Sequence, residues 1–179
     1  VIPDLATFGK AMANGFSVAA LTGRRELMQL GGLAHKQPRV FLLSTTNGGE
    51  AHELAAALKT VTFLQQGEVT AHVWRMGTEL RDGFNDISAS LGLKRHVSMG
   101  GPGCSPFQLF FNSENGIDYG LRTLYLQEMV KDRILIPYIA PSFSHSSSDV
   151  KRTLDASYRS LGVVKKAIQN GTVEGLLEG

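Results

Sequence analysis

Residues 3–16 read Pro-Asp-Leu-Ala-Thr-Phe-Gly-Lys-Ala-Met-Ala-Asn-Gly-Phe, a short apolar segment that ends in a turn. The Asn14-Gly15 pair indicates the turn, because glycine adopts a positive φ at little cost. Lys10 lies among small and apolar neighbours. A lysine amine is a nucleophile only when it is neutral, and burial among apolar groups favours the neutral form. Lys10 is therefore a candidate nucleophile, but these residues alone favour the common alternative, a surface lysine whose stem lies over apolar neighbours.

A second polar stretch, residues 44–51, reads Ser-Thr-Thr-Asn-Gly-Gly-Glu-Ala and leads directly into strong helix formers. Hydroxyl groups and free backbone N–H groups before a helix form an anion site, and the helix dipole adds to it. Thr45, Thr46 and Gly48 are the candidate ligands of such an anion. The alternative is an ordinary capping loop, since Ser, Thr and Asn are preferred helix caps.

Apolar residues along the rest of the chain predict the order β–α–α–β–β–α–β–α. Strands are expected at residues 40–43, 94–99, 107–111 and 134–136. Helices are expected at residues 50–58, 68–91, 118–131, and from 144–148 to 170. The last helix would turn one apolar face inward, formed by Val150, Leu154, Tyr158, Leu161, Val164 and Ile168. We expect a two-layer α/β or α+β lobe whose helices cover one sheet.

The composition excludes several classes of protein. Of 179 residues, 42% are hydrophobic and 19% charged, which is typical of a globular chain and not of a disordered, collagen-like or coiled-coil one. The 18 basic and 16 acidic residues leave a net charge of +2, without basic stripes, so we expect no nucleic-acid partner. No apolar run approaches the roughly 18 residues of a membrane span, so no membrane partner is expected.

Cysteine and histidine usage gives no sign of a metal or nucleophile site. A single cysteine, Cys104, excludes an internal disulfide framework and favours a reducing, cytoplasmic location. The five histidines show no paired ligand spacing, so we expect no metal site. His145 lies in the serine-rich residues 142–148, which lack the nucleophile-elbow pattern and are expected to form a polar loop that caps the last helix.

Residues 3–16 resemble the cofactor-lysine segment of the class III aminotransferases, with a Pro-Asp pair, a small residue before the lysine and a Gly-containing turn after it. Residues 23–28, Gly-Arg-Arg-Glu-Leu-Met, resemble the glutamate-1-semialdehyde aminomutase branch, and residues 44–51 resemble the Thr-x-(Ser/Gly)-Gly segment of the family. The resemblance implies an α/β protein, the C-terminal part of a fold-type-I transferase dependent on pyridoxal phosphate. A chain that begins at Val1, just before this segment, is expected to be cut from a longer protein.

The resemblance also implies domains and roles. Residues 1–67 would complete the large, cofactor-binding domain, and residues 68–179 would be a helix linker and an α+β small domain. Lys10 would hold the cofactor as a Schiff base and then move a proton at the substrate carbon. Thr46, with Thr45 and Gly48 beside it, would bind the cofactor phosphate and reach into the partner's site of a homodimer.

Departures from the family pattern leave the substrate open. Glu50-Ala51 follows the glycine pair where the family usually has Asn-Pro or His-Pro, and residues 141–146 match the aminomutase branch only in part. An aminomutase and an aminotransferase of another small amine or amino sugar are both compatible. The family residues that hold the pyridine nitrogen and stack on the ring precede the lysine, so this chain alone is expected to be inactive. A non-catalytic lobe for dimerisation or partner binding, and an anion-binding module on residues 45–49, are the alternatives.

Overall fold

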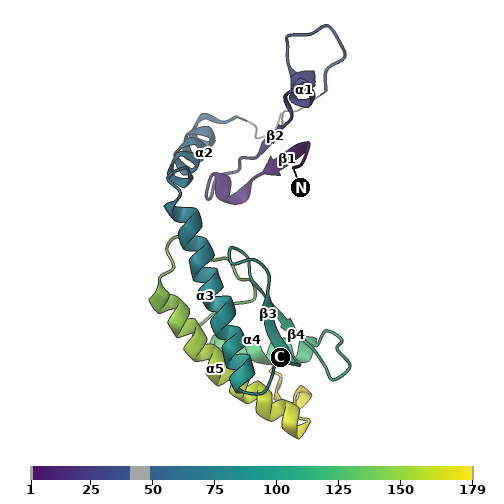
Figure 1. Cartoon of the computed structure of the whole chain (residues 1–179), viewed down its shortest axis with the longest axis vertical. Coiled ribbons are helices and arrows are strands. Elements are labelled where there is room, and N and C mark those ends of the chain that lie inside the picture. Colours follow the sequence, from purple (N-terminus) through teal and green to yellow (C-terminus); the bar gives the residue numbers. More distant parts are fainter. Residues whose placement is uncertain (1, 41–48, 179) are drawn as a thin grey trace. The chain divides into compact units, whose positions relative to one another are not determined.

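The computed structural model describes residues 2–40 and 49–178 of the chain. They form two compact units, Val1–Gly67 and Glu68–Gly179 (Figure 1). The predicted strand at 40–43 falls almost entirely outside the described residues, as do Thr45, Thr46 and Gly48. No helix in the described ranges is long and apolar enough to cross a membrane.

The first unit begins with a two-stranded antiparallel hairpin (Figure 1). Its elements are β1 (Leu5–Phe8), the 3-10 helix η1 (Lys10–Met12), β2 (Ala20–Gly23), α1 (Arg25–Met28), the 3-10 helix η2 (Gln29–Gly31) and α2 (Ala51–Leu64). The predicted turn at Asn14-Gly15 is confirmed, with φ values of 48° and 118°. The helix predicted at 50–58 is also confirmed, and α2 continues beyond it to Leu64.

A backbone and side-chain clamp closes the open end of the hairpin. The backbone N–H of Arg24 donates to the carbonyl of Asp4 at 3.0 Å, and the Arg24 guanidinium lies 3.1 Å from the Asp4 carboxylate. A Cβ at Gly23 would lie 2.3 Å from the same carbonyl oxygen, so only glycine allows this approach. The sequence pattern assigns no strands here, because four-residue strands leave too few positions for a periodic signal.

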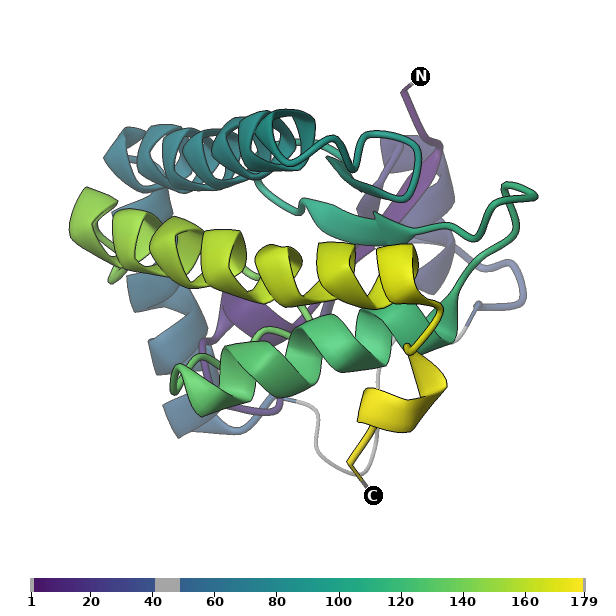
Figure 2. The same ribbon diagram turned by 90° about the horizontal axis from the view of Figure 1, so that it is seen from below.

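The second unit contains a two-stranded antiparallel sheet that two helices contact, and a third helix packs against those two helices. Its elements are α3 (Glu68–Ser90), β3 (Val97–Gly100), β4 (Phe107–Phe110), α4 (Tyr119–Lys131), α5 (Ser147–Asn170) and the 3-10 helix η3 (Glu174–Leu176). Helix α5 contacts both α3 and α4, and these helices lie side by side in Figure 2. The helices predicted at 68–91 and 118–131 and the strands predicted at 94–99 and 107–111 are therefore confirmed to within a few residues.

Side-chain and glycine caps set the ends of the helices in this unit. Asp118 accepts a hydrogen bond from the Leu121 N–H at the start of α4. Ser146 and Asp149 form a capping box at the start of α5, which confirms the predicted capping loop. Gly171, with a φ of 64°, ends α5 in the left-handed conformation.

The core of the second unit lies between the helices and the sheet. It contains Val97 and Met99 from alternate positions of β3, and aromatic side chains from three elements. The Tyr125 ring meets Phe84 edge-on at 5.8 Å between centroids and lies 5.4 Å from Phe110. Edge-to-face contacts of this kind add to the free energy gained from burial itself.

Two expectations for this unit are wrong. Residues 134–136 form no strand: the Ile134 N–H bonds back to the Met129 carbonyl, while Leu135 is 81% exposed. The outer two residues of this triplet pack against the core, although no strand pairs with the segment among the described residues. Its apolar sequence is the same as that of a short strand. The described residues also form two separate two-stranded sheets, not the one sheet expected.

The buried face of α5 differs from the predicted one at its centre. Tyr158 is 53% exposed, whereas Ala156, Ser157 and Ser160 are buried. Small side chains occupy this face because α5 packs against two other helices, and Ser157 fits there by bonding to the Tyr125 hydroxyl at 2.9 Å. The prediction counts only apolar residues as buried, so it assigns these serines to the exposed side of the helix.

The buried Tyr125 hydroxyl predicts a loss of stability at alkaline pH. Burial raises the pKa of Tyr125 from 10.0 to about 12. Between these values the unfolded chain loses the phenolic proton first, so the free energy of unfolding falls as pH rises, by roughly 2–3 kcal/mol in total. We expect urea unfolding, followed by Trp74 fluorescence, to show this decline between pH 10 and 12 and to show less of it in Tyr125→Phe.

The control for this experiment is Tyr158→Phe, which removes a phenol from the exposed side of α5. We expect this variant to keep the decline of the wild type. An unchanged decline in Tyr125→Phe would contradict the assignment to the buried hydroxyl.

Candidate functional site

Lys10 occupies an unusual backbone position directly after β1. Gly9 is extended, and Lys10 then takes a φ of 50° as the first residue of η1. The Ala13 N–H donates to the Lys10 carbonyl at 3.3 Å and holds this turn. A non-glycine residue in the left-handed region costs on the order of 1 kcal/mol or more, and such positions gather at functional sites.

The Lys10 side chain is exposed in the described part of the chain, as expected for a surface lysine. No residue of η1 is buried, and the flanking Gly9 and Ala11 are too short to cover a lysine stem. Among residues 2–40 and 49–178, no hydrogen bond or ion pair engages its Nζ. The turn therefore presents a free primary amine.

The amino end of α2 lies next to the lysine segment. Helix α2 contacts η1, and the rings of Phe16 and His52 meet edge-on with centroids 5.8 Å apart. Thr45, Thr46 and Gly48 precede α2 in the chain but lie outside the described residues, so the roles assigned to them stay predictions.

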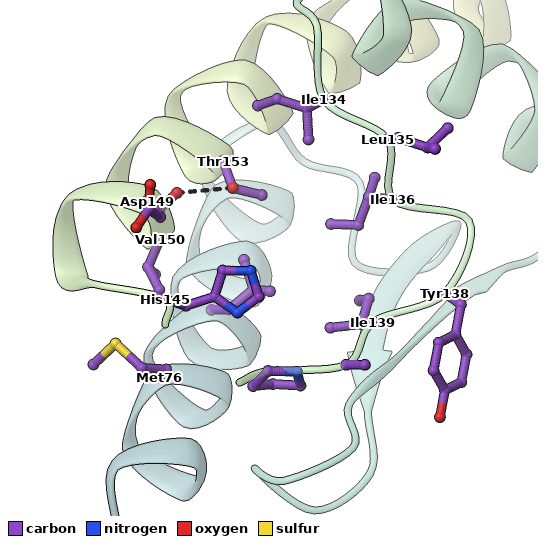
Figure 3. Close-up of a pocket in the computed structure, with 13 residues that line it drawn as sticks. Met76, Ile134, Leu135, Ile136, Tyr138, Ile139, His145, Asp149, Val150 and Thr153 are labelled. Carbon is purple, nitrogen blue, oxygen red and sulfur yellow. Dashed lines mark hydrogen bonds between the residues drawn. The ribbon is translucent and has the colours of Figure 1, made fainter. Parts of the chain in front are cut away.

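The second unit contains a separate pocket of about 250 Å³ between α3, α5 and residues 134–141 (Figure 3). Its walls are mostly apolar, and its polar side chains His145, Asp149 and Thr153 bond to serines and to the backbone at the start of α5. The His145 Nδ1 accepts from the Ser142 N–H at 3.0 Å. Hydrogen bonds from the Ser146 hydroxyl and amide lower the pKa of Asp149. The Ser142 hydroxyl also lies 3.1 Å from the His145 Nδ1. Among the described residues no carboxylate bonds to this ring, so the pair lacks the orienting third group of a catalytic triad.

Cys104, the free thiol, lies in the turn between β3 and β4 and is partly exposed. No histidine ring bonds to it among the described residues. In the described ranges the thiol therefore has no histidine base beside it to favour the reactive thiolate.

The sequence of the chain matches a known family. The family described as Aminotransferase class-III matches residues 1–101. Over 94% of its length the chain is 33% identical to 3-aminobutyryl-CoA aminotransferase of Cloacimonas acidaminovorans. Over 92% of its length it is 32% identical to glutamate-1-semialdehyde 2,1-aminomutase of Methanothermobacter thermautotrophicus. It spans only 39% and 40% of the lengths of these two proteins.

Solved structures show the same likeness. The FumI protein of Sphingopyxis sp. MTA144, determined with PLP, superimposes with a TM-score of 0.78 at 23% identity, over 93% of this chain and 38% of FumI. An omega-transaminase from Sphaerobacter thermophilus gives 0.78 at 18% identity, over 91% of this chain and 39% of that protein. At such identities the likeness concerns the fold, and it confirms the expected C-terminal part of a fold-type-I transferase.

Proposed function

Because the chain belongs to the class III aminotransferase family, we propose that the whole protein catalyses amino-group transfer with pyridoxal phosphate, held by Lys10. The observation that carries this proposal is the free, exposed amine of Lys10 at a left-handed position directly after β1. Residues held in the left-handed region gather at functional sites, so this backbone position supports a functional role for Lys10.

The residues present suit this cofactor. The Lys10 Nζ offers the primary amine that an aldehyde requires, and it would hold the cofactor covalently as a Schiff base. When bound, the cofactor supplies an electron sink for charge that develops on the substrate carbon. The released Lys10 Nζ would accept the proton from that carbon and return it, a role that needs a neutral amine within hydrogen-bond reach.

The segment before α2 would bind the phosphate. Thr45 and Thr46 offer hydroxyl donors and Gly48 offers a backbone N–H, ahead of a helix whose positive end attracts anions. In a homodimer, Thr46 would serve the site of the partner subunit. Support for assembly comes from α2 itself, where Leu54 is 50% and Leu58 is 70% exposed, unusually high for leucine.

The substrate class follows from the relatives only coarsely. One is named for a coenzyme A thioester of an amino acid and the other for an amino-aldehyde, so we propose a small amino compound of either kind. The motif at 23–28, which resembles the aminomutase branch, contains residues that stabilise the fold of the hairpin. Gly23 and Arg24 close the hairpin on Asp4, so this motif is weak support for aminomutase specificity. A cytoplasmic location also stays a prediction.

Borohydride trapping tests the assignment of Lys10. We expect reduction of the whole protein with one equivalent of pyridoxal phosphate to fix one pyridoxyl group on the peptide that contains Lys10. The matched controls are Lys36 and Lys59, exposed lysines of the same unit, whose peptides should stay unmodified. Peptide mass mapping gives the result, and a label on another lysine with none on Lys10 would contradict the proposal.

A further inference from the structure

Three side chains that can bind metals gather where α2 begins: Glu50, His52 and Glu53. One ligand atom from each lies within 4.8 Å of the other two. We propose that this cluster binds a divalent cation of the first transition row, with Zn²⁺ as the best match. The proposal is independent of Lys10 and of the amino-transfer reaction.

The geometry of the cluster is close to that of a metal site. The His52 Nε2 lies 3.5 Å from the Glu50 Oε2. Ligands of a tetrahedral Zn²⁺ lie about 2 Å from the ion, which places them roughly 3.4 Å from one another. The edge-on contact with Phe16 restricts the His52 ring, so this ligand is oriented before a metal binds.

The buried carboxylate of Glu53 is the observation that points to a ligand. Glu53 is only 7% exposed, and its Oε2 has no hydrogen-bond partner among the described residues. A buried carboxylate oxygen without a partner is unfavourable, and such groups are rare in native proteins. A cation shared with Glu50 and His52 would satisfy this oxygen.

A simpler explanation is that the amino end of α2 stabilises these carboxylates without a metal. A helix dipole contributes about half a positive charge, which does not balance two carboxylates. Capping would need a hydrogen bond to the first turn, yet the Glu50 side chain makes none. Within the described residues, the Glu53 Oε2 therefore has no hydrogen-bond donor.

The ligand set selects among cations. Imidazole with carboxylates suits Zn²⁺ and its neighbours, whereas Ca²⁺ requires six to eight oxygen ligands that three side chains do not supply. Glu50 and His52 are more than half exposed, which leaves room for water at a remaining position. The sequence pattern predicts no metal site because the histidines lack paired spacing, and the proposed cluster contains a single histidine.

Calorimetric titration of the metal-stripped whole protein with Zn²⁺ tests the proposal. We expect one ion per chain, with affinity lowered about tenfold or more in Glu53→Gln and in His52→Asn. The matched controls are His35→Asn, the other histidine of this unit, and Glu68→Gln, an exposed glutamate in the first turn of α3. Both should bind as the wild type does, and Ca²⁺ should bind at least tenfold more weakly than Zn²⁺.

A second measurement removes the ambiguity of a folding defect. Zn²⁺ should raise the unfolding temperature of the wild type and have little effect on Glu53→Gln, which keeps the size of the side chain. His52→Asn alters an exposed residue and provides the same comparison if Glu53→Gln does not fold. Wild-type Zn²⁺ affinity in the His52 or Glu53 variants, or its loss in His35→Asn, would overturn the proposal.

Discussion

Replacing Lys10 with alanine in the whole protein is expected to reduce turnover by about 10³-fold or more. Under the proposed function this one amine both holds the cofactor and moves the proton at the substrate carbon. Removing a positioned proton-transfer group alone typically costs between about 10² and 10⁴ in rate. We expect the loss to appear in kcat rather than in KM, because proton transfer stabilises the transition state and not the bound substrate.

The measurement compares Lys10→Ala with Lys36→Ala, which removes an exposed lysine elsewhere in the first unit. The substrates to assay are 3-aminobutyryl-CoA and glutamate 1-semialdehyde, which match the names of the relatives. A small amine such as methylamine should restore part of the lost rate to Lys10→Ala, because it can carry the missing proton. Turnover of Lys10→Ala within tenfold of the wild type would contradict the proposed role.

Elements with strong local signals could be predicted from the sequence. Helix α3 repeats apolar residues over 23 positions, and α5 carries a Ser146 cap at one end and Gly171 at the other. Such signals depend only on residues close together in the chain. The hairpin in the first unit lacked them, because its pairing depends on Asp4 meeting Arg24 across twenty positions.

Tertiary contacts account for the other differences. The buried Ser157 hydroxyl donates to the Thr153 carbonyl one turn earlier, and it also lies 2.9 Å from the Tyr125 hydroxyl, 32 positions earlier in the chain. The contact with Tyr125 joins two helices. No window along α5 contains that information. Residues 134–136 pair with no strand among the described residues. An apolar triplet alone does not reveal whether a partner strand is present.

The candidate site was predictable mainly through resemblance. Nothing in the composition around Lys10 distinguishes it from a surface lysine, and its side chain is in fact exposed in the described chain. What the structure adds is the positive φ, which no residue pattern encodes for a lysine. The Glu50, His52 and Glu53 cluster could not be found from the sequence. The proposal of a metal site there depends on the burial of Glu53, which sequence spacing does not reveal.

The close approach of α3 to the turn between β3 and β4 predicts a large effect on stability. Gly77 is buried on α3, and a Cβ built there would lie 1.8 Å from the carbonyl oxygen of Gly103. That atom belongs to the backbone and cannot rotate away. On the other side of the contact, a Cβ at Gly103 would lie 2.6 Å from the carbonyl oxygen of Trp74, so glycine is needed on both surfaces.

Gly77→Ala is therefore expected to lower the free energy of unfolding by roughly 3 kcal/mol, as overpacking against a rigid group does. Intrinsic helix propensity opposes this result, because alanine is about 1 kcal/mol better than glycine inside a helix. Gly162→Ala in α5 measures that propensity alone, since no atom lies within 4 Å of its Cβ position, and it should stabilise by about 0.5–1 kcal/mol. Urea unfolding followed by far-ultraviolet circular dichroism should thus give opposite signs for two identical substitutions in helices of one unit. The same sign for both would show that α3 can move away from Gly103, and that the contact does not constrain the fold.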